Sequence, residues 1–343
     1  MRKLLNTLFI LSEDVYLSLE GENIVIFRDE LQLGRFPLHT LEDILCFSYK
    51  GGSPALMGKC AAMGIGLAFF SPQGKFLARV CGESRGNVLL RKEQYRRSDN
   101  PEYSCMIARK FILGKVYNSR WVLERATRDH ALRIDVERIK HTSKLLGNSL
   151  EMILNCNELE SLRGLEGETA ARYFDVMNEL ILQNKGDFAM QSRSRRPPLD
   201  RFNALLSFIY TLLAHHCAAA LEGVGLDSYV GFLHRDRAGR RSLALDLMEE
   251  LRPLLGDRLA ITMVNNRNIL PHHFDVRENG AVLLNDEGRK IVLTAWQERK
   301  KEVLKHPFLE EKIPWGLVAY VQALLLARYL RGDIDDYPPF LWK

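Results

Sequence analysis

The chain has 343 residues and a net charge of +5, from 48 Lys and Arg against 43 Asp and Glu. Hydrophobic residues make up 46% and charged residues 27%, which excludes a disordered or collagen-like chain. The length predicts about two domains. The small basic excess permits a polyanionic partner without requiring one.

Cysteine spacing and hydropathy indicate the cellular compartment of the protein. The six cysteines stand singly, without a Cys-x-x-Cys pair, and most lie in apolar stretches. This pattern argues against a zinc ribbon or a disulfide scaffold and predicts reduced core residues. The first apolar run ends at Leu11, too early for a signal peptide, and residues 315–330 are too short and polar for a membrane span. We therefore expect a cytoplasmic protein that does not contact a membrane.

The first part of the chain, up to about residue 85, predicts a β-rich region. Short apolar or alternating runs cover residues 4–11, 15–19, 23–28, 31–36, 41–47, 65–70 and 76–81. Ser53-Pro54 has the form of a helix start, a cap followed by proline, and predicts a helix to about residue 63. We expect a sandwich-like or barrel-like domain with one embedded helix.

After residue 86 the pattern changes to helical spacing. It covers residues 106–128, 132–144, 150–157, 165–183, 202–220 and 315–330. Turn residues interrupt β-type residues between 276 and 296, where we expect a small hairpin. The predicted fold class is α+β, with a β-rich N-terminal sandwich-like domain (residues 1–90) followed by a larger, mostly α-helical domain (residues 91–343).

Residues 186–201 predict a loop, because Pro197-Pro198 cannot continue a helix. The loop contains Arg193, Arg195 and Arg196. Two interpretations stay open, a solvated basic connector and a mobile strap over a phosphate backbone.

Three further segments place polar residues where an apolar face is expected. In the first, residues 163–174, Glu166 shares a helical face with Tyr173, and Gly164 and Gly167 flank it. Glycine there would let another backbone or a ligand approach closely. Taken alone, Glu166 also fits a surface residue at a helix start, where the helix dipole favours a carboxylate.

The second segment, residues 231–241, ends a short apolar run with His234. Four arginines follow that histidine, Arg235, Arg237, Arg240 and Arg241. Taken alone, His234 fits a structural histidine. A neutral histidine ringed by arginines also suits a metal or phosphate site.

The third segment, residues 242–253, places Asp246, Glu249 and Glu250 near one helix face. Asp-x-x-Glu also resembles a capping box. Ser242 is the better cap, and the acids would then lie mid-helix beside apolar neighbours, which requires a reason.

One histidine with two or three carboxylates makes a hard site of nitrogen and oxygen ligands. Mg²⁺ or Mn²⁺ suits such a site better than structural zinc does. Such a site surrounded by arginines indicates phosphate chemistry, because a bound Mg²⁺ or Mn²⁺ would neutralise charge on phosphorus and orient the attacking or leaving oxygen. The residues alone therefore indicate metal-dependent phosphoryl transfer on nucleic acid, and they leave hydrolysis and transesterification open.

Other candidate sites are weaker. His215-His216 lies within the helix predicted over 202–220 and is interpreted as packing. His272-His273 with Asp275 could bind a metal, but these residues follow Pro271 in a loop without a carboxylate pair. The glycine loops of P-loop and dinucleotide-binding proteins are absent from the sequence.

Together and in this order, the three segments resemble the CRISPR-associated integrases of spacer acquisition. The matching stretches are Arg-Gly-Leu-Glu-Gly around Glu166, Gly-Phe-Leu-His ending at His234, and Leu-Ala-Leu-Asp-Leu-Met-Glu-Glu at 243–250. Residues 86–91, 195–198, 203–208 and 288–290 also look familial, and residues 1–8 resemble the type I branch. The resemblance covers essentially the whole chain.

The resemblance implies a β-rich dimerisation domain and an α-helical catalytic domain. It also implies Mg²⁺ or Mn²⁺ held by Glu166, His234 and Glu249. Many relatives have Asp at the last position, so Glu249 is one methylene longer. Asp246 matches a neighbouring family acid close to the metal, which we count among the catalytic residues. Tyr173 is expected to pack beside the site rather than stack on DNA.

The resemblance further implies an integrase and endonuclease that joins prespacer DNA 3′-hydroxyl ends to a CRISPR repeat by transesterification. The implied partners are double-stranded DNA (prespacer and repeat), a second copy of the chain, and a small ferredoxin-like adaptation protein. The expected phosphate contacts are Arg193, Arg195, Arg196, Arg235, Arg240, Arg241 and Arg252. Two alternatives are a metal-dependent nuclease without integration and a non-catalytic DNA-binding scaffold. Residues 335–339 either contact the partner or form a frayed end.

Overall fold

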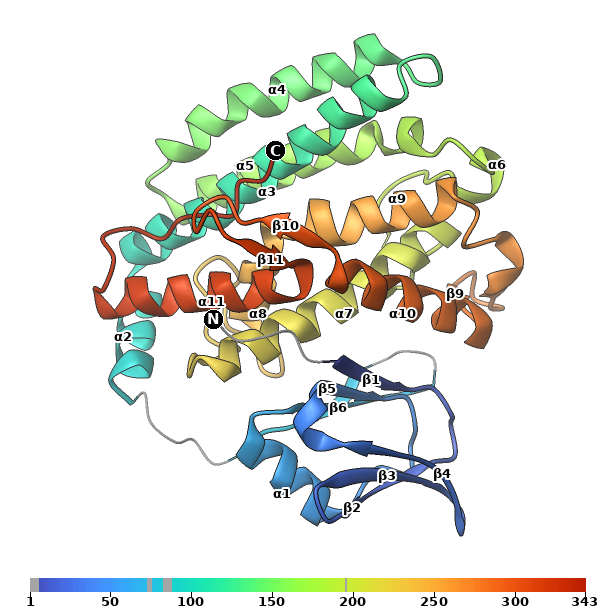
Figure 1. The fold of residues 1–343 in the computed structure, drawn as a ribbon. Helices are drawn as coiled ribbons and strands as arrows, with labels where there is room; N and C mark the ends of the chain where they lie inside the picture. The colour runs from blue at the N-terminus through green and yellow to red at the C-terminus, as the bar shows by residue number, and fades with distance from the viewer. Residues whose placement is uncertain (1–5, 73–75, 83–87, 195) are drawn as a thin grey trace.

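The computed structural model describes residues 6–72, 76–82, 88–194 and 196–343. The N-terminal part of the chain forms two β-sheets and the remainder is mostly helical (Figure 1). This arrangement confirms the predicted fold class. In Figure 1 the N-terminal domain, in blue, lies beneath the helices of the larger domain.

Two sheets and one helix make up the N-terminal domain. The first sheet contains, in spatial order, β1 (Asn6–Ile10), β5 (Leu41–Cys46), β6 (Gly66–Phe70) and β7 (Phe76–Val80). Its first three strands are parallel, and β7 is antiparallel to β6. The second sheet is an antiparallel meander of β2 (Tyr16–Glu20), β3 (Asn23–Arg28) and β4 (Leu31–Pro37). Helix α1 (Pro54–Met63) begins at the predicted cap, where Ser53 Oγ accepts a hydrogen bond from Leu56 N.

The larger domain is a set of packed helices. These are α2 (Val88–Asp99), α3 (Pro101–Asp129), α4 (Val136–Leu154), α5 (Leu159–Asp175), α6 (Lys185–Phe188), α7 (Arg201–Gly223), α8 (Ser242–Glu249), α9 (Arg258–Asn265), α10 (Asp286–Lys301) and α11 (Trp315–Arg331). Short helical turns are η1 (Leu38–Thr40) in the first domain, then η2 (Met177–Leu180), η3 (Arg252–Asp257) and η4 (Pro271–His273). Two small hairpins pair β8 (Phe274–Val276) with β9 (Val282–Leu284) and β10 (Val303–Lys305) with β11 (Lys312–Pro314).

The four-stranded sheet joins the two domains because its two faces enter different cores. Ile44 packs in the core of the N-terminal domain, whereas its neighbour Leu45 packs in the core of the helical domain. This alternation follows from the two-residue period of a strand. Phe47 stacks on Phe70 at 4.9 Å between ring centres, and Phe70 meets His215 of α7 edge-on at 5.8 Å.

Helix α7 is the apolar centre of the helical domain. By length and composition alone it could cross a membrane, but 78% of its most apolar window is buried inside the protein. His216 within it lies 3.0 Å, through Nε2, from the carbonyl oxygen of Gly316 on α11. Both His215 and His216 are buried, which confirms that they are packing residues.

Helix boundaries differ from the sequence prediction in three places. One helix, α4 (Val136–Leu154), takes the place of the two predicted over 132–144 and 150–157, and it starts where Asp135 accepts a hydrogen bond from Arg138 N. The hairpin expected over 276–296 ends at β9, because Asn285 caps Gly288 N and starts α10. Helix α5 begins at Leu159, six residues earlier than the predicted 165, and ends at Asp175.

The cysteines and the C-terminal segment also differ in part from expectation. Cys46, Cys60, Cys105 and Cys217 are buried as predicted, Cys156 is partly buried, and Cys81 is exposed, so the core assignment was wrong for Cys81. The alternative that residues 335–339 form a frayed end was also wrong. Tyr337 and Phe340 are fully buried. Glu250 accepts hydrogen bonds from Tyr337 Oη, Phe340 N and Gln322 Nε2, which fastens this segment next to α8.

Candidate functional site

Asp246 of α8 organises the segment that carries His234. Its Oδ2 accepts hydrogen bonds from Phe232 N at 2.6 Å and Leu233 N at 2.9 Å, and its Oδ1 accepts one from His234 N at 3.0 Å. Oδ1 also lies 2.6 Å from Nδ1 of the His234 ring. A carboxylate can only accept, so the neutral ring carries its proton on Nδ1. The Nε2 lone pair of His234 is therefore left for another partner, as in carboxylate–histidine–metal arrangements.

Close packing around Asp246 explains the glycine in Gly-Phe-Leu-His. A Cβ on Gly231 would lie 2.7 Å from Asp246 Oδ2 and 2.8 Å from the carbonyl carbon of Ser242. The loop can approach α8 only without a side chain at this position. Apart from the chain neighbours and the nearby backbone of α5 itself, no described atom lies within 4 Å of a Cβ placed on Gly164 or Gly167, so no other described segment approaches closely there.

The acids of the third segment lie inside a helix rather than in a capping box. Helix α8 begins at Ser242 and contains Asp246 and Glu249, both buried. The capping position is taken by Arg241, which makes no side-chain cap, so Ser242 is the first helical residue and not the predicted cap. Asp246 lies in the middle of α8 and Glu249 is its last residue, and buried acids at both positions need compensating partners.

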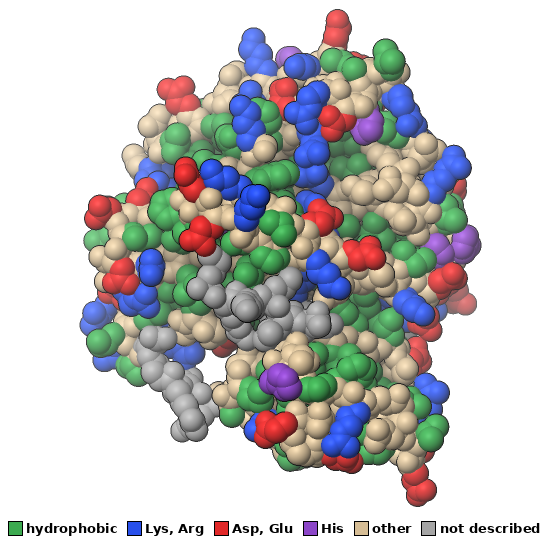
Figure 2. Space-filling view, in the orientation of Figure 1, with side chains coloured by type: hydrophobic (Ala, Val, Ile, Leu, Met, Phe, Trp, Pro, Cys, Tyr) green, Lys and Arg blue, Asp and Glu red, His purple; other side chains and the backbone are tan. Residues whose placement is uncertain are grey.

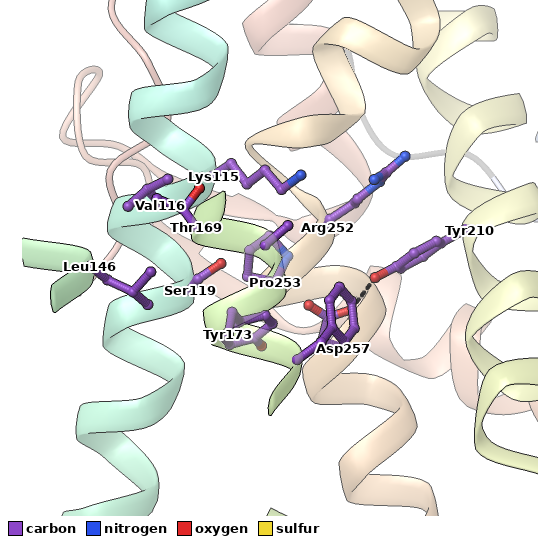
Figure 3. Close-up of a pocket in the computed structure, with 12 residues that line it drawn as sticks. Lys115, Val116, Ser119, Leu146, Thr169, Tyr173, Tyr210, Arg252, Pro253 and Asp257 are labelled. Carbon is purple, nitrogen blue, oxygen red and sulfur yellow. Dashed lines mark hydrogen bonds between the residues drawn. The ribbon is translucent and has the colours of Figure 1, made fainter. Parts of the chain in front are cut away.

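A lysine outside the three predicted segments joins two of the expected metal ligands. Lys115 of α3 forms an ion pair with Glu166 of α5, and its Nζ lies 2.8 Å from Glu249 Oε2. Figure 3 shows Lys115 extending from α3 toward Arg252. A guanidinium nitrogen of Arg252 lies 3.1 Å from the other carboxylate oxygen of Glu249. Three helices therefore bring two carboxylates to one ammonium group.

The charges around Glu249 keep it ionised despite its burial. Burial alone would raise the pKa of Glu249, but the charges of Arg252 and Lys115 outweigh burial and lower that pKa to about 2. The residue is only 2% exposed. A full negative charge is thus held at neutral pH inside the protein, and His234 is near enough to influence it.

The donor set fits a divalent cation. Glu249 Oε2 is buried, and its partner is the ammonium group of Lys115 at 2.8 Å, which a bound cation could replace. Glu166 and Glu249 supply hard oxygen ligands, and His234 offers its Nε2 lone pair. Lys115 already places one positive charge between the two carboxylates. The residues expected to hold Mg²⁺ or Mn²⁺ are therefore chemically suited to it.

A small space beside these residues is closed by aromatic side chains. It holds only about 10 Å³, and its lining includes Lys115, Tyr173, Tyr210 and Asp257 (Figure 3). Tyr173 is 3% exposed, which confirms packing rather than an exposed stacking surface. Tyr210 donates a hydrogen bond to Asp257. Burial raises the pKa of Asp257 to about 6 against the lowering effect of Tyr210 and Arg252.

Of the arginines expected to contact phosphate, Arg252 lies at the carboxylates. Arg193 is engaged inside the protein, where it donates to Asn203 Oδ1 and Ser194 O and lies 5.3 Å from the Tyr210 ring centre. The guanidinium group of Arg193 is therefore less available to contact phosphate than the sequence suggested.

The remaining arginines lie toward the surface. Arg235 is exposed and pairs with Glu160 at 2.6 Å. Arg241 donates from Nε to Tyr229 Oη at 3.4 Å. Arg196 is exposed and Arg240 is partly buried, and Arg195 lies outside the described residues. Their contact with phosphate stays a prediction.

A second group of possible metal ligands lies in the loop region weighed above. His272, His273 and Glu287 place their ligand atoms within 4.8 Å of one another, and Asp275 is not part of this group. Nδ1 of His273 accepts a hydrogen bond from Leu270 N at 3.0 Å. The neutral ring then carries its proton on Nε2, which lies 3.8 Å from Glu287 Oε1. The nitrogen nearest the acid therefore has no lone pair for a metal.

Comparisons with known proteins agree with the resemblance. The sequence profile of the family described as "CRISPR associated protein Cas1" matches residues 8–298. The chain is 52% identical to the "CRISPR-associated endonuclease Cas1 2" of Rhodospirillum rubrum, over 100% of both chains. Its fold is similar to a casposase bound to an integration product (TM-score 0.84, 20% identity, 99% of this chain and 95% of that one). It is also similar to part of a Cas6-RT-Cas1–Cas2 complex (TM-score 0.82, 22% identity, 99% of this chain and 36% of that one).

Proposed function

Because the chain belongs to the Cas1 family and is thus a CRISPR-associated nuclease, we propose that it integrates prespacer DNA into a CRISPR repeat array. In the proposed reaction a prespacer 3′-hydroxyl attacks a phosphodiester at the edge of the repeat, and the 3′-oxygen of the repeat leaves. One phosphodiester forms for each one broken, so the step needs no ATP. Two such half reactions insert one spacer.

The observation that carries this proposal is the convergence of Glu166 and Glu249 on Lys115. Mg²⁺ or Mn²⁺ held by Glu166, His234 and Glu249 would neutralise charge on the reacting phosphorus. Arg252, beside Glu249, would contact the oxygens of the same phosphate.

Asp246 has a different role in this proposal. Both of its oxygens are already occupied by three backbone N–H groups and the His234 ring. We therefore propose that Asp246 is a positioning residue, which fixes the proton on Nδ1 of His234 and the direction of its Nε2.

The proposed assembly includes a homodimer formed through the N-terminal domain. Strand β4 is at an edge of the meander, and its Leu31 and Leu33 are 67% and 44% exposed. An exposed apolar edge strand pairs readily with another chain. Leu33→Lys should convert a dimer to a monomer in light scattering, and an unchanged molar mass would place the dimer interface elsewhere.

The other proposed partners are double-stranded DNA and a small ferredoxin-like adaptation protein. A similar fold occurs in a Cas6-RT-Cas1–Cas2 complex and in a casposase bound to an integration product, which supports a Cas partner and DNA. We propose that the protein works in the cytoplasm, where the repeat array is.

Plasmid joining tests the proposed reaction. The purified protein and its partner are incubated with Mg²⁺ or Mn²⁺, a supercoiled plasmid carrying a repeat array, and a fluorescent duplex with either 3′-hydroxyl or 3′-phosphate ends. We expect label to enter the plasmid only with 3′-hydroxyl ends. Plasmid fragments without joined label would favour a nuclease without integration, and metal-independent binding without turnover would favour a scaffold.

A further inference from the structure

A second pocket, separate from the carboxylate site, lies where the C-terminal segment meets α3. It has a volume of about 200 Å³ and is bounded by α3, by the turn η3 with the start of α9, and by the last two residues. A single water needs only about 10–15 Å³ of such space. The pocket is therefore roomy enough for a group much larger than water. Figure 1 shows the C-terminus against α3.

The pocket is lined by an excess of positive charge. Its cationic side chains are Arg125, Arg128, Arg258 and Lys343, and no acidic side chain is among its described lining residues. Arg125 and Arg128 share a single carboxylate, that of Asp129, at 3.3 Å and 3.1 Å. Figure 2 shows Lys and Arg side chains gathered over the part of the helical domain where the C-terminus meets α3.

Two donors at this pocket are buried without an acceptor. They are Nε1 of Trp121 and one terminal guanidinium nitrogen of Arg258. Buried donors are normally paired, so two at one pocket indicate a missing acceptor. Burial, with the neighbouring charges of Arg299 and Arg125, also lowers the pKa of Arg258 to about 10. Positive charge is thus held there without full compensation.

The indole rings hold the cations in place. The Arg258 guanidinium lies 5.2 Å from the Trp342 ring centre, and Lys343 Nζ lies 4.6 Å from the Trp121 ring centre. Cations over indole faces are attracted to the ring electrons. The donors are therefore ordered before a ligand arrives, which reduces the entropy lost on binding.

We propose that this pocket binds a phosphate group. A tetrahedral oxyanion accepts several charge-assisted hydrogen bonds at once, and guanidinium groups match its geometry. A phosphate in a nucleic-acid backbone and a free inorganic phosphate offer the same chemistry here. Trp121 follows Lys115 by six residues on α3, about 9 Å along the axis, so one nucleic acid could reach both sites. The assignment does not depend on whether the chain integrates DNA.

The test measures binding in EDTA, so that the carboxylate site and strand joining do not contribute. Three proteins are compared: wild type, the pocket variant Arg125→Gln/Arg128→Gln, and the matched control Arg138→Gln/Arg331→Gln, whose arginines are exposed outside the pocket. Arg258→Gln is a further pocket variant. Because Arg258 is partly buried, the exposed Arg125/Arg128 pair keeps the test valid if Arg258→Gln does not fold.

The first arm measures the salt dependence of binding to a fluorescent oligothymidylate and a fluorescent duplex. If a backbone phosphate occupies the pocket, the slope of log K against log salt should fall by about 0.7 per lost contact on single strands or about 0.9 on duplex. In the control, the slope should fall by no more than the loss of two positive charges outside the pocket would cause. A pocket-specific fall identifies nucleic acid as the source.

The second arm measures thermal unfolding in inorganic phosphate and in chloride at matched ionic strength. A phosphate-specific rise in Tm that the pocket variants lose, with unchanged DNA slopes, identifies free phosphate as the ligand. If the pocket variants match the control in both arms, the pocket does not bind phosphate and the proposal is wrong.

Discussion

Two groups of side chains among the described residues are candidates for a metal site, and they differ in the spacing of their ligand atoms and in the availability of their lone pairs. At His272, His273 and Glu287 the ligand atoms lie within 4.8 Å of one another. Among the described residues no other group of three meets that distance, so the ligand atoms of Glu166, His234 and Glu249 are further apart.

By distance alone the group of His272, His273 and Glu287 is the better candidate, but the use of its lone pairs favours the other group. The lone pair on Nδ1 of His273 is already used by Leu270 N, which leaves the proton on the nitrogen nearest Glu287. At the other group Asp246 fixes the His234 proton on Nδ1, which leaves the Nε2 lone pair available, and the partner of Glu249 Oε2 is the ammonium group of Lys115. An available lone pair on His234 Nε2, close to the buried charge of Glu249, is thus a better sign of a metal centre than short distances alone.

The largest expected effect distinguishes the two groups directly. Glu249→Gln should reduce both cleavage and strand joining to background, because the substitution keeps the shape of the side chain and removes its charge. Glu166→Gln and His234→Ala should do the same. Glu287→Gln is the matched control and should retain wild-type rates in the plasmid assay. Loss of activity in the control with full activity in Glu249→Gln would exchange the roles of the two groups.

A smaller effect tests the role assigned to Asp246. Asp246→Asn should lower the rate or the metal affinity by about 10–100-fold, the usual cost of losing a partner that orients a metal-binding histidine. The amide can still fill the space, but it no longer favours the proton on Nδ1 of His234. A complete loss equal to that of Glu249→Gln would make Asp246 a direct ligand.

The charge balance around Glu249 predicts a pH dependence of stability. In EDTA near pH 7, Glu249→Gln should unfold with on the order of 3 kcal/mol less free energy than wild type. The folded pKa of about 2 lies below the ordinary value of 4.5. The contribution is therefore complete above about pH 4.5 and is lost as the pH falls toward 2. Urea unfolding should show the difference shrinking between about pH 4.5 and pH 2, and a constant difference would contradict this origin.

The smallest effect concerns Lys115. Lys115→Met should bind Mn²⁺ several-fold more tightly in calorimetry, because the ion no longer competes with an ammonium group for Glu166 and Glu249. In EDTA the same variant should have a lower Tm, since two carboxylates lose their shared cation. Lys140→Met, on the surface of α4, is the control. Unchanged or weaker Mn²⁺ binding would show that Lys115 is no competitor.

The sequence was sufficient to predict the fold class, β-rich first and mostly helical after it, and to single out candidate site residues. Glu166, His234 and the acids of α8 stood out because polar residues interrupted apolar patterns. Lys115 carried the same signal, a charged residue between Gly114 and Val116 in an apolar stretch of α3, but the sequence does not show that its partners are on α5 and α8.

Other contacts between distant segments could not be predicted either, because the sequence does not show which segments pack together. The burial of Glu250 depends on Gln322, Tyr337 and Phe340, which lie 72 to 90 residues further along the chain. Helix ends were missed where a cap outweighed apolar spacing, as at Asp135 and Asn285.

An anomalous difference map from a crystal soaked in manganese tests the central claim most directly. We expect one strong peak bound by Glu166, His234 Nε2 and Glu249, with Lys115 moved away from the two carboxylates. A peak at His272 and Glu287, with the ion pairs of Lys115 intact, would contradict it.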